Sequence, residues 1–282
     1  METNHVFNIN PTTRIGSNYP LFICGPCAVE SEAIILHTAE TLKKIFERLN
    51  LPFVFKASFD KANRTSGRSF RSIGFHESLR ILSRVKNDFG VPVITDIHET
   101  IQVKEVADVV DIIQIPAFLC RQTDLIQAVA RTGKVVNIKK GQFMSPDDMF
   151  YSVQKSLDVG NEHVILTERG SSFGYHNLVV DMRSLVIMRK IAPVIFDLTH
   201  SVQQPGALGG KSGGQREFAP HLARAAAAVG VDGFFMETHP DPETALSDGQ
   251  NMIPLNELET LVKSLLNIWN VSNPYWGNII HE

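Results

Sequence analysis

Three shortages in this 282-residue sequence exclude several classes of protein. There are 3 cysteines, too few for the disulfide framework of a small secreted domain. There is no run of about 18 apolar residues, so we predict no membrane-spanning helix. The opening residues, METNHVFNINP, lack the basic stretch and following apolar stretch of a signal peptide. We therefore expect a cytoplasmic protein that does not bind a membrane.

An excess of charge of one sign is also lacking. The chain has 27 Lys plus Arg against 30 Asp plus Glu, a net charge of -3. This balance argues against nucleic acid as a partner, because nucleic-acid-binding proteins usually carry a basic excess on one face. An anionic ligand would have to be held by a local group of cations. Hydrophobic residues make up 43% of the chain, which permits a large core and excludes global disorder.

Two glycine-rich phosphate-binding signatures are missing. The sequence has no GxGxxG, which usually follows the first strand of a dinucleotide-binding doubly wound sheet. The stretch 206–214 resembles a P-loop, but Pro205 stands where a Walker A motif needs its first glycine. We expect this stretch to be a mobile lid, with a simple flexible loop as the alternative.

The sequence does contain eight short apolar runs that alternate with amphipathic segments. The runs are rich in Val, Ile and Phe and mostly apolar throughout, which is typical of parallel strands buried on both faces. This alternation predicts an α/β fold, a (β/α)8 TIM barrel, as one domain over residues 1–282. The predicted strands are 21–24, 53–58, 91–95, 111–115, 135–139, 163–167, 194–198 and 231–236, and the predicted helices are roughly 32–49, 76–88, 99–108, 122–132, 146–158, 178–191, 217–229 and 255–269.

Residues 1–20 precede the first predicted strand. They hold two short β-type runs, VFNI and RIG, around the turn-like NPTT. This pattern predicts an N-terminal β-hairpin that plugs the amino end of the barrel. A frayed terminus is the alternative.

Polar residues gather where each predicted strand ends. In a TIM barrel these ends carry the active site, so the asymmetry predicts an enzyme. The cations among them imply phosphate or carboxylate ligands, because Arg grips both with paired hydrogen bonds. In the alternative interpretation, some of them pair with Asp60, Asp96 and Glu168 instead. The cations are Lys56, Lys61, Arg64, Lys139, Lys140 and Arg169, with Arg121 nearby.

Four further residues at strand ends form a possible metal site. Cys27, His200, Glu237 and Asp248 follow the first, seventh and eighth predicted strands, which are neighbours in a closed barrel. A thiolate, an imidazole and two carboxylates suit Zn, Fe, Mn or a similar divalent ion. Each residue also has a plainer interpretation, since a buried Cys is often a small core residue and a lone His is often only hydrogen-bonded.

Six stretches of the chain form long, specific motifs: KANR at 61–64, IIQIPAFLCRQTDL at 112–125, KKGQF at 139–143, LTERG at 166–170, FGYHNLVVDMRS at 173–184 and FMETHPDPETALSDG at 235–249. These motifs closely resemble those of the 3-deoxy-D-manno-octulosonate 8-phosphate synthases, and the likeness runs from about Leu21 to about Leu266. The related 3-deoxy-D-arabino-heptulosonate 7-phosphate synthases have Lys-Pro-Arg where this chain has KANR, a difference that divides the two families by their aldose.

The resemblance implies an aldol-type condensation of phosphoenolpyruvate with D-arabinose 5-phosphate and water. The products are 3-deoxy-D-manno-octulosonate 8-phosphate, which feeds lipopolysaccharide synthesis, and inorganic phosphate. The sister synthase that uses erythrose 4-phosphate and a non-catalytic phosphosugar-binding barrel remain alternatives. The resemblance also implies a homotetramer, in which Arg121 reaches the phosphate of the aldose from a neighbouring subunit.

Site residues follow from the same motifs. Lys56, Lys61, Lys139 and Arg169 are expected to hold phosphoenolpyruvate, with Gln114 nearby, and Lys139 is a candidate proton donor. The family has a metal-free class with Asn after the first strand and a metal-dependent class with Cys there, so Cys27 implies the second. The resemblance thus predicts Lys139, His200 and Cys27 as catalytic residues, Cys27, His200, Glu237 and Asp248 as metal ligands, and Lys56, Lys61, Asn63, Arg64, Ser66, Asp96, Gln114, Arg121, Lys139, Arg169 and His200 as substrate-binding residues.

Overall fold

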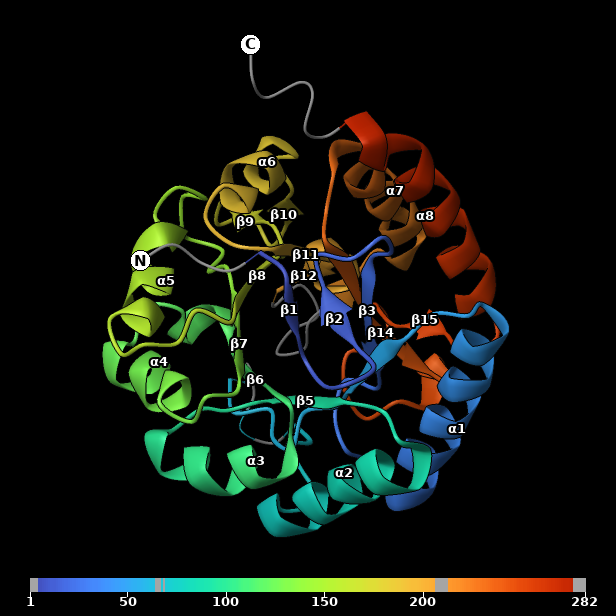
Figure 1. The fold of residues 1–282 in the computed structure, drawn as a ribbon. Helices are drawn as coiled ribbons and strands as arrows, with labels where there is room; N and C mark the ends of the chain where they lie inside the picture. Colours follow the sequence, from blue (N-terminus) through green and yellow to red (C-terminus); the bar gives the residue numbers. More distant parts are fainter. Residues whose placement is uncertain (1–4, 64–66, 68, 206–212, 276–282) are drawn as a thin grey trace.

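A computed structural model describes residues 5–63, 67, 69–205 and 213–275. Within these ranges, eight parallel strands form a closed barrel, because the last strand pairs with both its predecessor and the first (Figure 1). The predicted (β/α)8 barrel is confirmed. The barrel strands are β3 (Leu21–Gly25), β4 (Phe53–Lys56), β5 (Val93–Asp96), β6 (Ile112–Ile115), β7 (Val135–Lys139), β8 (Val164–Glu168), β11 (Val194–Asp197) and β14 (Gly233–His239).

Helices form a ring around this barrel (Figure 1). The outward residues of the strands pack against them: Phe53 of β4 stacks on Phe46 of the first helix, with ring centroids 4.7 Å apart. All eight predicted helices are present. They are α1 (Glu32–Arg48), α2 (Phe75–Phe89), α3 (Val103–Val109), α4 (Thr123–Ala130), α5 (Met149–Leu157), α6 (Arg183–Arg189), α7 (Ala219–Val229) and α8 (Leu258–Ser272). None of the described helices is long and apolar enough to cross a membrane.

The inward residues of the strands form a second, separate apolar cluster. It includes Val54, Ile94 and Ile195, which lie toward the amino ends of their strands. The predicted hairpin is present as β1 (Phe7–Asn8) and β2 (Arg14–Ile15), an antiparallel pair. Phe7 and Ile15 belong to this inner cluster, so the hairpin closes the amino end of the barrel as expected (Figure 1).

Several short strands lie in the loops at the carboxyl end of the barrel. A hairpin of β9 (Ser171–Ser172) and β10 (Leu178–Val179) follows β8. After β11, β12 (Gln203–Gln204) pairs with β13 (Gly213–Gly214), and β15 (Ile253–Pro254) adds to the end of β14. The possible lid at 206–214 falls mostly outside the described residues, since 206–212 are not part of them.

Candidate active site

A cavity of about 1040 Å³ opens where the barrel strands end. The last residues of β4, β5 and β7, namely Lys56, Asp96 and Lys139, line it together with residues of the following loops. Because side chains alternate along a strand, these residues share the inner face with the apolar cluster below them. The cavity contains ten of the predicted site residues: Lys56, Lys61, Asn63, Asp96, Gln114, Lys139, Arg169, His200, Glu237 and Asp248.

Lys56 and Asp96 form a buried ion pair on one wall of the cavity. Their Nζ and Oδ1 atoms are 3.4 Å apart, and Lys56 also donates to Ser58 Oγ at 2.8 Å. His98 Nε2 lies 3.2 Å from the other Asp96 oxygen. Burial alone would raise the pKa of Asp96, but the charge of Lys56 and the hydrogen bond from His98 lower it well below its usual range. Asp96 is therefore an anion that holds Lys56 in place.

Lys139, Asp197 and His200 form a second buried chain. Asp197 accepts a hydrogen bond from Lys139 Nζ, and its Oδ2 lies 2.7 Å from His200 Nδ1. Burial lowers the pKa of Lys139 despite this carboxylate. Burial opposes ionisation of Asp197, yet His200 and Lys139 lower the pKa of this carboxyl far below its usual range. Asp197 thus fixes the orientation of both the lysine and the imidazole.

Two more cations face the cavity from other loops. Arg169 donates to Gln203 Oε1 at 3.0 Å, while its buried Nη1 has no partner among the described residues. Burial lowers the pKa of Arg169, so an added anion beside it would be favourable. Lys61 Nζ lies 3.7 Å from Glu237 Oε1. Burial opposes the charge of Lys61, but nearby acidic groups, Cys27 first among them, raise its pKa overall.

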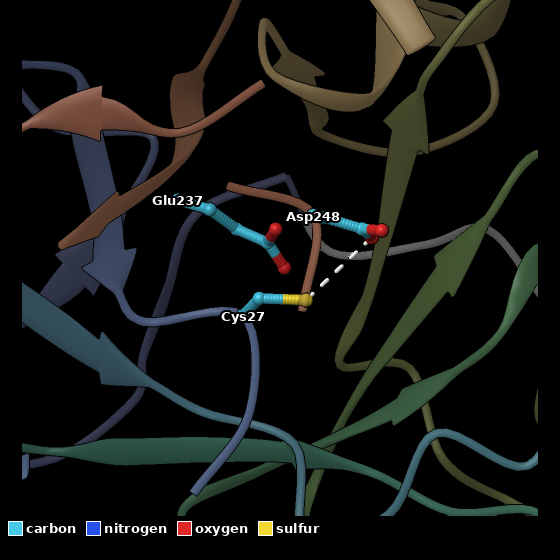
Figure 2. A group of neighbouring side chains, drawn as sticks. All are labelled: Cys27, Glu237 and Asp248. Carbon is cyan, nitrogen blue, oxygen red and sulfur yellow. Dashed lines mark hydrogen bonds between the residues drawn. The ribbon is translucent and has the colours of Figure 1, made fainter. Parts of the chain in front are cut away.

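Cys27, Glu237 and Asp248 meet beside these cations. Their ligand atoms all lie within 4.8 Å of one another, and Figure 2 shows the three side chains pointing toward a common space. The Cys27 sulfur is 3.6 Å from Asp248 Oδ2 and 2.7 Å from Ser247 Oγ. Both carboxylate oxygens of Glu237 are buried and accept no hydrogen bond within the described residues. A buried carboxylate that accepts no hydrogen bond, and that lies beside a thiol and a second carboxylate, fits a divalent cation.

His200, the fourth predicted ligand, lies outside that group of three. Its Nε2 is 3.5 Å from Glu237 Oε1, so it borders the metal group, and its Nδ1 faces Asp197. This is the usual arrangement for a histidine ligand, in which one nitrogen faces the ion and the other a carboxylate. That His200 binds a metal remains a prediction.

Four more of the residues that the sequence groups at this end of the barrel, Lys140, Arg121, Arg64 and Ser66, are not among the described residues that line the cavity. Lys140 does not line the cavity: it is buried on the outer face of the barrel, with Nζ 3.4 Å from Glu168 Oε1. Successive residues at a strand end point to opposite faces, so Lys139 and Lys140 could not both turn inward. Arg121 is exposed and lies outside the cavity of its own chain. Arg64 and Ser66 are outside the described residues.

Sequence reasoning missed several residues that shape the cavity. Asp197 ends β11 and is fully buried, yet it was not singled out among the predicted site residues. Its position two residues after Ile195, on the inner face, was a usable signal. His98 and Gln203 were also missed. Their loops gave no pattern that distinguishes a residue facing the cavity from one facing solvent.

Fold and site together define a class: a TIM-barrel enzyme whose carboxyl-end cavity is lined by several Lys and Arg side chains and adjoins a Cys, Glu and Asp group that could hold a metal. The chain belongs to the DAHP synthetase I family, whose model matches residues 4–270.

Curated relatives cover almost the whole chain. The 2-dehydro-3-deoxyphosphooctonate aldolase of Dichelobacter nodosus (strain VCS1703A) is 60% identical over 253 residues, which are 89% of this chain and 91% of the relative. Aldolases of the same name from Acidithiobacillus ferrooxidans (strain ATCC 53993 / BNL-5-31) and Geobacter sulfurreducens are 58% and 59% identical. These two matches cover 91% and 90% of this chain, and 92% and 94% of the relatives.

Proposed function

We propose that this chain condenses phosphoenolpyruvate with D-arabinose 5-phosphate and water. The products are 3-deoxy-D-manno-octulosonate 8-phosphate, an intermediate for lipopolysaccharide, and inorganic phosphate. The observation that carries the proposal is the convergence of Lys56, Lys61, Lys139 and Arg169 on one cavity. The chain that builds this cavity is 58–60% identical to 2-dehydro-3-deoxyphosphooctonate aldolases over most of its length. A reaction on phosphoenolpyruvate also agrees with the expected cytoplasmic location.

Phosphoenolpyruvate carries a phosphate and a carboxylate, and four cations can bind both. The buried Nη1 of Arg169 has no hydrogen-bond partner among the described residues, which suits a phosphate or carboxylate oxygen. Lys56 and Lys61 are each held by a buried acid, Asp96 and Glu237, so their ammonium groups are fixed before the ligand arrives. Such preorganisation lowers the free energy needed to order the site on binding.

The aldose would occupy the outer part of the cavity. Asn63, from the KANR motif, lines the cavity, and its side-chain amide can bind sugar hydroxyls as donor and acceptor. Arg64 and Ser66, which are also predicted to bind substrate, come one and three residues after Asn63 in the sequence.

The reaction needs two anions brought together and a proton delivered. The methylene carbon of phosphoenolpyruvate forms a bond to the aldehyde carbon, which requires an approach of about 3–3.5 Å. The aldehyde oxygen then takes a proton, and water adds to the carbon that bears the phosphate and loses one proton. The hydroxyl oxygen formed in this way becomes the ketone oxygen when it loses its second proton and phosphate leaves by cleavage of the C–O bond. Lys139 is the proposed donor, because burial lowers its pKa and so eases proton release. Asp197 holds Lys139 toward the cavity.

We propose Cys27, His200, Glu237 and Asp248 as ligands of a divalent ion. The three side chains that already meet, Cys27, Glu237 and Asp248, are acidic, and their negative charge would oppose two anionic substrates. A bound divalent ion, such as Zn, Fe or Mn, would offset that charge and supply Lewis acidity to a substrate oxygen or to water. The chain's own part is to hold the thiolate and both carboxylates close together.

We also propose a homotetramer in which Arg121 completes a neighbouring site. Arg121 is exposed and does not line the cavity of its own chain. Large apolar side chains in the segments after β6 and β7 are exposed in the single chain, as expected for an interface. They include Phe118 at 53%, Phe143 at 60% and Tyr151 at 66% exposure.

A phosphate-release assay tests the function. The protein is incubated with phosphoenolpyruvate and either D-arabinose 5-phosphate or D-erythrose 4-phosphate, with and without a chelator. We expect release with the five-carbon aldose and much less with the four-carbon one. Equal or faster release with erythrose 4-phosphate would assign the chain to the sister reaction. No release with either aldose would contradict the proposal and favour a non-catalytic phosphosugar-binding barrel.

A further inference from the structure

Three of the four proposed metal ligands, Cys27, Glu237 and Asp248, come from separate segments. The buried carboxylate of Glu30 belongs to the Cys27 segment and contacts the other two. We propose that Glu30 is a positioning residue that holds these segments in register, an inference that rests on the metal site proposed above. Glu30 lies three residues after Cys27 and has 7% of its surface exposed. Its role would be to keep the thiolate of Cys27 and the carboxylates of Glu237 and Asp248 at binding distance.

The first link joins the Cys27 segment to the Asp248 segment. Glu30 Oε1 accepts a hydrogen bond from the backbone N–H of Leu246 at 3.0 Å. Leu246 lies two residues before Asp248, in a loop that has no regular secondary structure there. Asp248 itself has a positive φ of 50°, a conformation uncommon for a residue with a side chain. A loop with such a residue needs contacts from outside to hold its shape.

The second link joins the Cys27 segment to the end of β14. Glu30 Oε2 lies 3.8 Å from Nε2 of His239, the last residue of that strand and two residues after Glu237. Both side chains are almost fully buried. The other ring nitrogen, Nδ1, lies 2.7 Å from the carbonyl oxygen of Asp241, which fixes the ring at the start of the next loop.

Glu30 therefore connects the segments that carry Cys27, Glu237 and Asp248 without contributing a ligand atom to this group. The Cys27 segment is far from the other two in sequence, since 216 positions separate Glu30 from Leu246. A metal needs its donor atoms placed together before binding, and neighbouring carboxylates that orient the ligands change metal affinity by about 10- to 100-fold. Glu30 has the position and the contacts for this task.

Cobalt binding to the metal-stripped protein tests the inference without any turnover. Co²⁺ bound by a thiolate gives a charge-transfer absorption, so the titration reports both affinity and the presence of Cys27 among the ligands. We expect Glu30→Ala, which removes the acceptor of the Leu246 N–H, to weaken Co²⁺ binding by about 10- to 100-fold. Glu30→Asp keeps the charge but is one methylene shorter, so it should also weaken binding, and it decides the question if Glu30→Ala does not fold.

Asp232→Ala is the matched control. Asp232 also accepts a backbone hydrogen bond, from Val194 N at 2.7 Å, and also faces a basic side chain, Arg189, but at the amino end of the barrel. It should lower thermal stability and leave Co²⁺ affinity unchanged. Wild-type affinity in folded Glu30→Asp would overturn the positioning role. Failure of the wild-type protein to bind Co²⁺ would instead overturn the metal site itself.

Discussion

The inside of the barrel has an apolar half and a charged half, and the border between them falls within single strands. In β4, Val54 belongs to the inner apolar cluster, while Lys56, the next residue on the same face, lines the cavity. In β5, Ile94 and Asp96 repeat this change. Two residues along a strand span about 7 Å, so the barrel interior changes from apolar to charged within that distance.

The comparison shows how the fold separates stability from chemistry. Phe7 and Ile15 of the hairpin close the apolar half. The charged half is open and contains buried ion pairs, which are weak contributors to stability because desolvation offsets their attraction. Phe235 marks the border: it belongs to the apolar cluster, and the Lys139 ammonium lies 3.6 Å from the centroid of its ring. We expect changes above this border to affect turnover and changes below it to affect unfolding.

The largest effect is expected from Lys139→Met. Loss of the proton donor should lower kcat for phosphate release by about 10²- to 10⁴-fold. Lys140→Met is the matched control, because Lys140 points to the outer face and pairs with Glu168. It should lower the free energy of unfolding by about 3–5 kcal/mol and spare kcat in the folded fraction. A Lys139→Met enzyme with wild-type kcat would contradict the proposed role of this lysine.

Ile165→Ala probes the apolar half. Ile165 is fully buried in the inner cluster, and truncation leaves a cavity that should lower the free energy of unfolding by about 2–5 kcal/mol. Urea denaturation measures this change. The KM for both substrates should remain within about twofold of the wild-type value, a difference worth about 0.4 kcal/mol. A large rise in KM with little loss of stability would contradict the proposal that the apolar half provides stability and the charged half provides chemistry.

Arg121→Ala tests whether the charged half is complete within one chain. If Arg121 binds the aldose phosphate across an interface, its loss removes charge-assisted hydrogen bonds worth about 1.5–3 kcal/mol. The KM for arabinose 5-phosphate should then rise by roughly 10- to 150-fold, with little change for phosphoenolpyruvate. Steady-state kinetics with each substrate varied in turn gives both values. Unchanged KM values would make Arg121 a surface cation.

The smallest effect concerns Asp96 and pH. Its pKa is lower in the folded chain than in the unfolded one, because Lys56 and His98 outweigh the effect of burial. Asp96 therefore adds stability above its unfolded pKa of about 3.9, and that stability disappears as the pH falls through the folded pKa. Urea denaturation of wild type and Asp96→Asn should show a difference near pH 6 that shrinks below about pH 4. A difference that grows in acid would contradict the assigned direction.

The sequence carried enough information for the barrel but less for the site. Runs such as LFIC at 21–24 are apolar on both faces, and that pattern is typical of a strand in a parallel sheet. The prediction that Lys140 faces the cavity was wrong because successive residues at a strand end point to opposite faces, and only Lys139 of this pair points inward. The contact of Asp197 with both Lys139 and His200 could not be predicted from the sequence, because it depends on how side chains at the ends of β7 and β11 meet inside the barrel. The link from Glu30 to Leu246 is of the same kind.

The proposed metal group lies at the centre of the charged half, so chelation tests the account most directly. Phosphate release is measured on the protein as purified, after exhaustive chelation, and after return of a divalent ion, with elemental analysis of each sample. We predict that activity disappears with the metal and returns with it, and that affinity falls at low pH as Cys27 gains a proton. Full activity in a sample with no detectable metal would contradict the account, and Cys27 would then be an ordinary buried thiol.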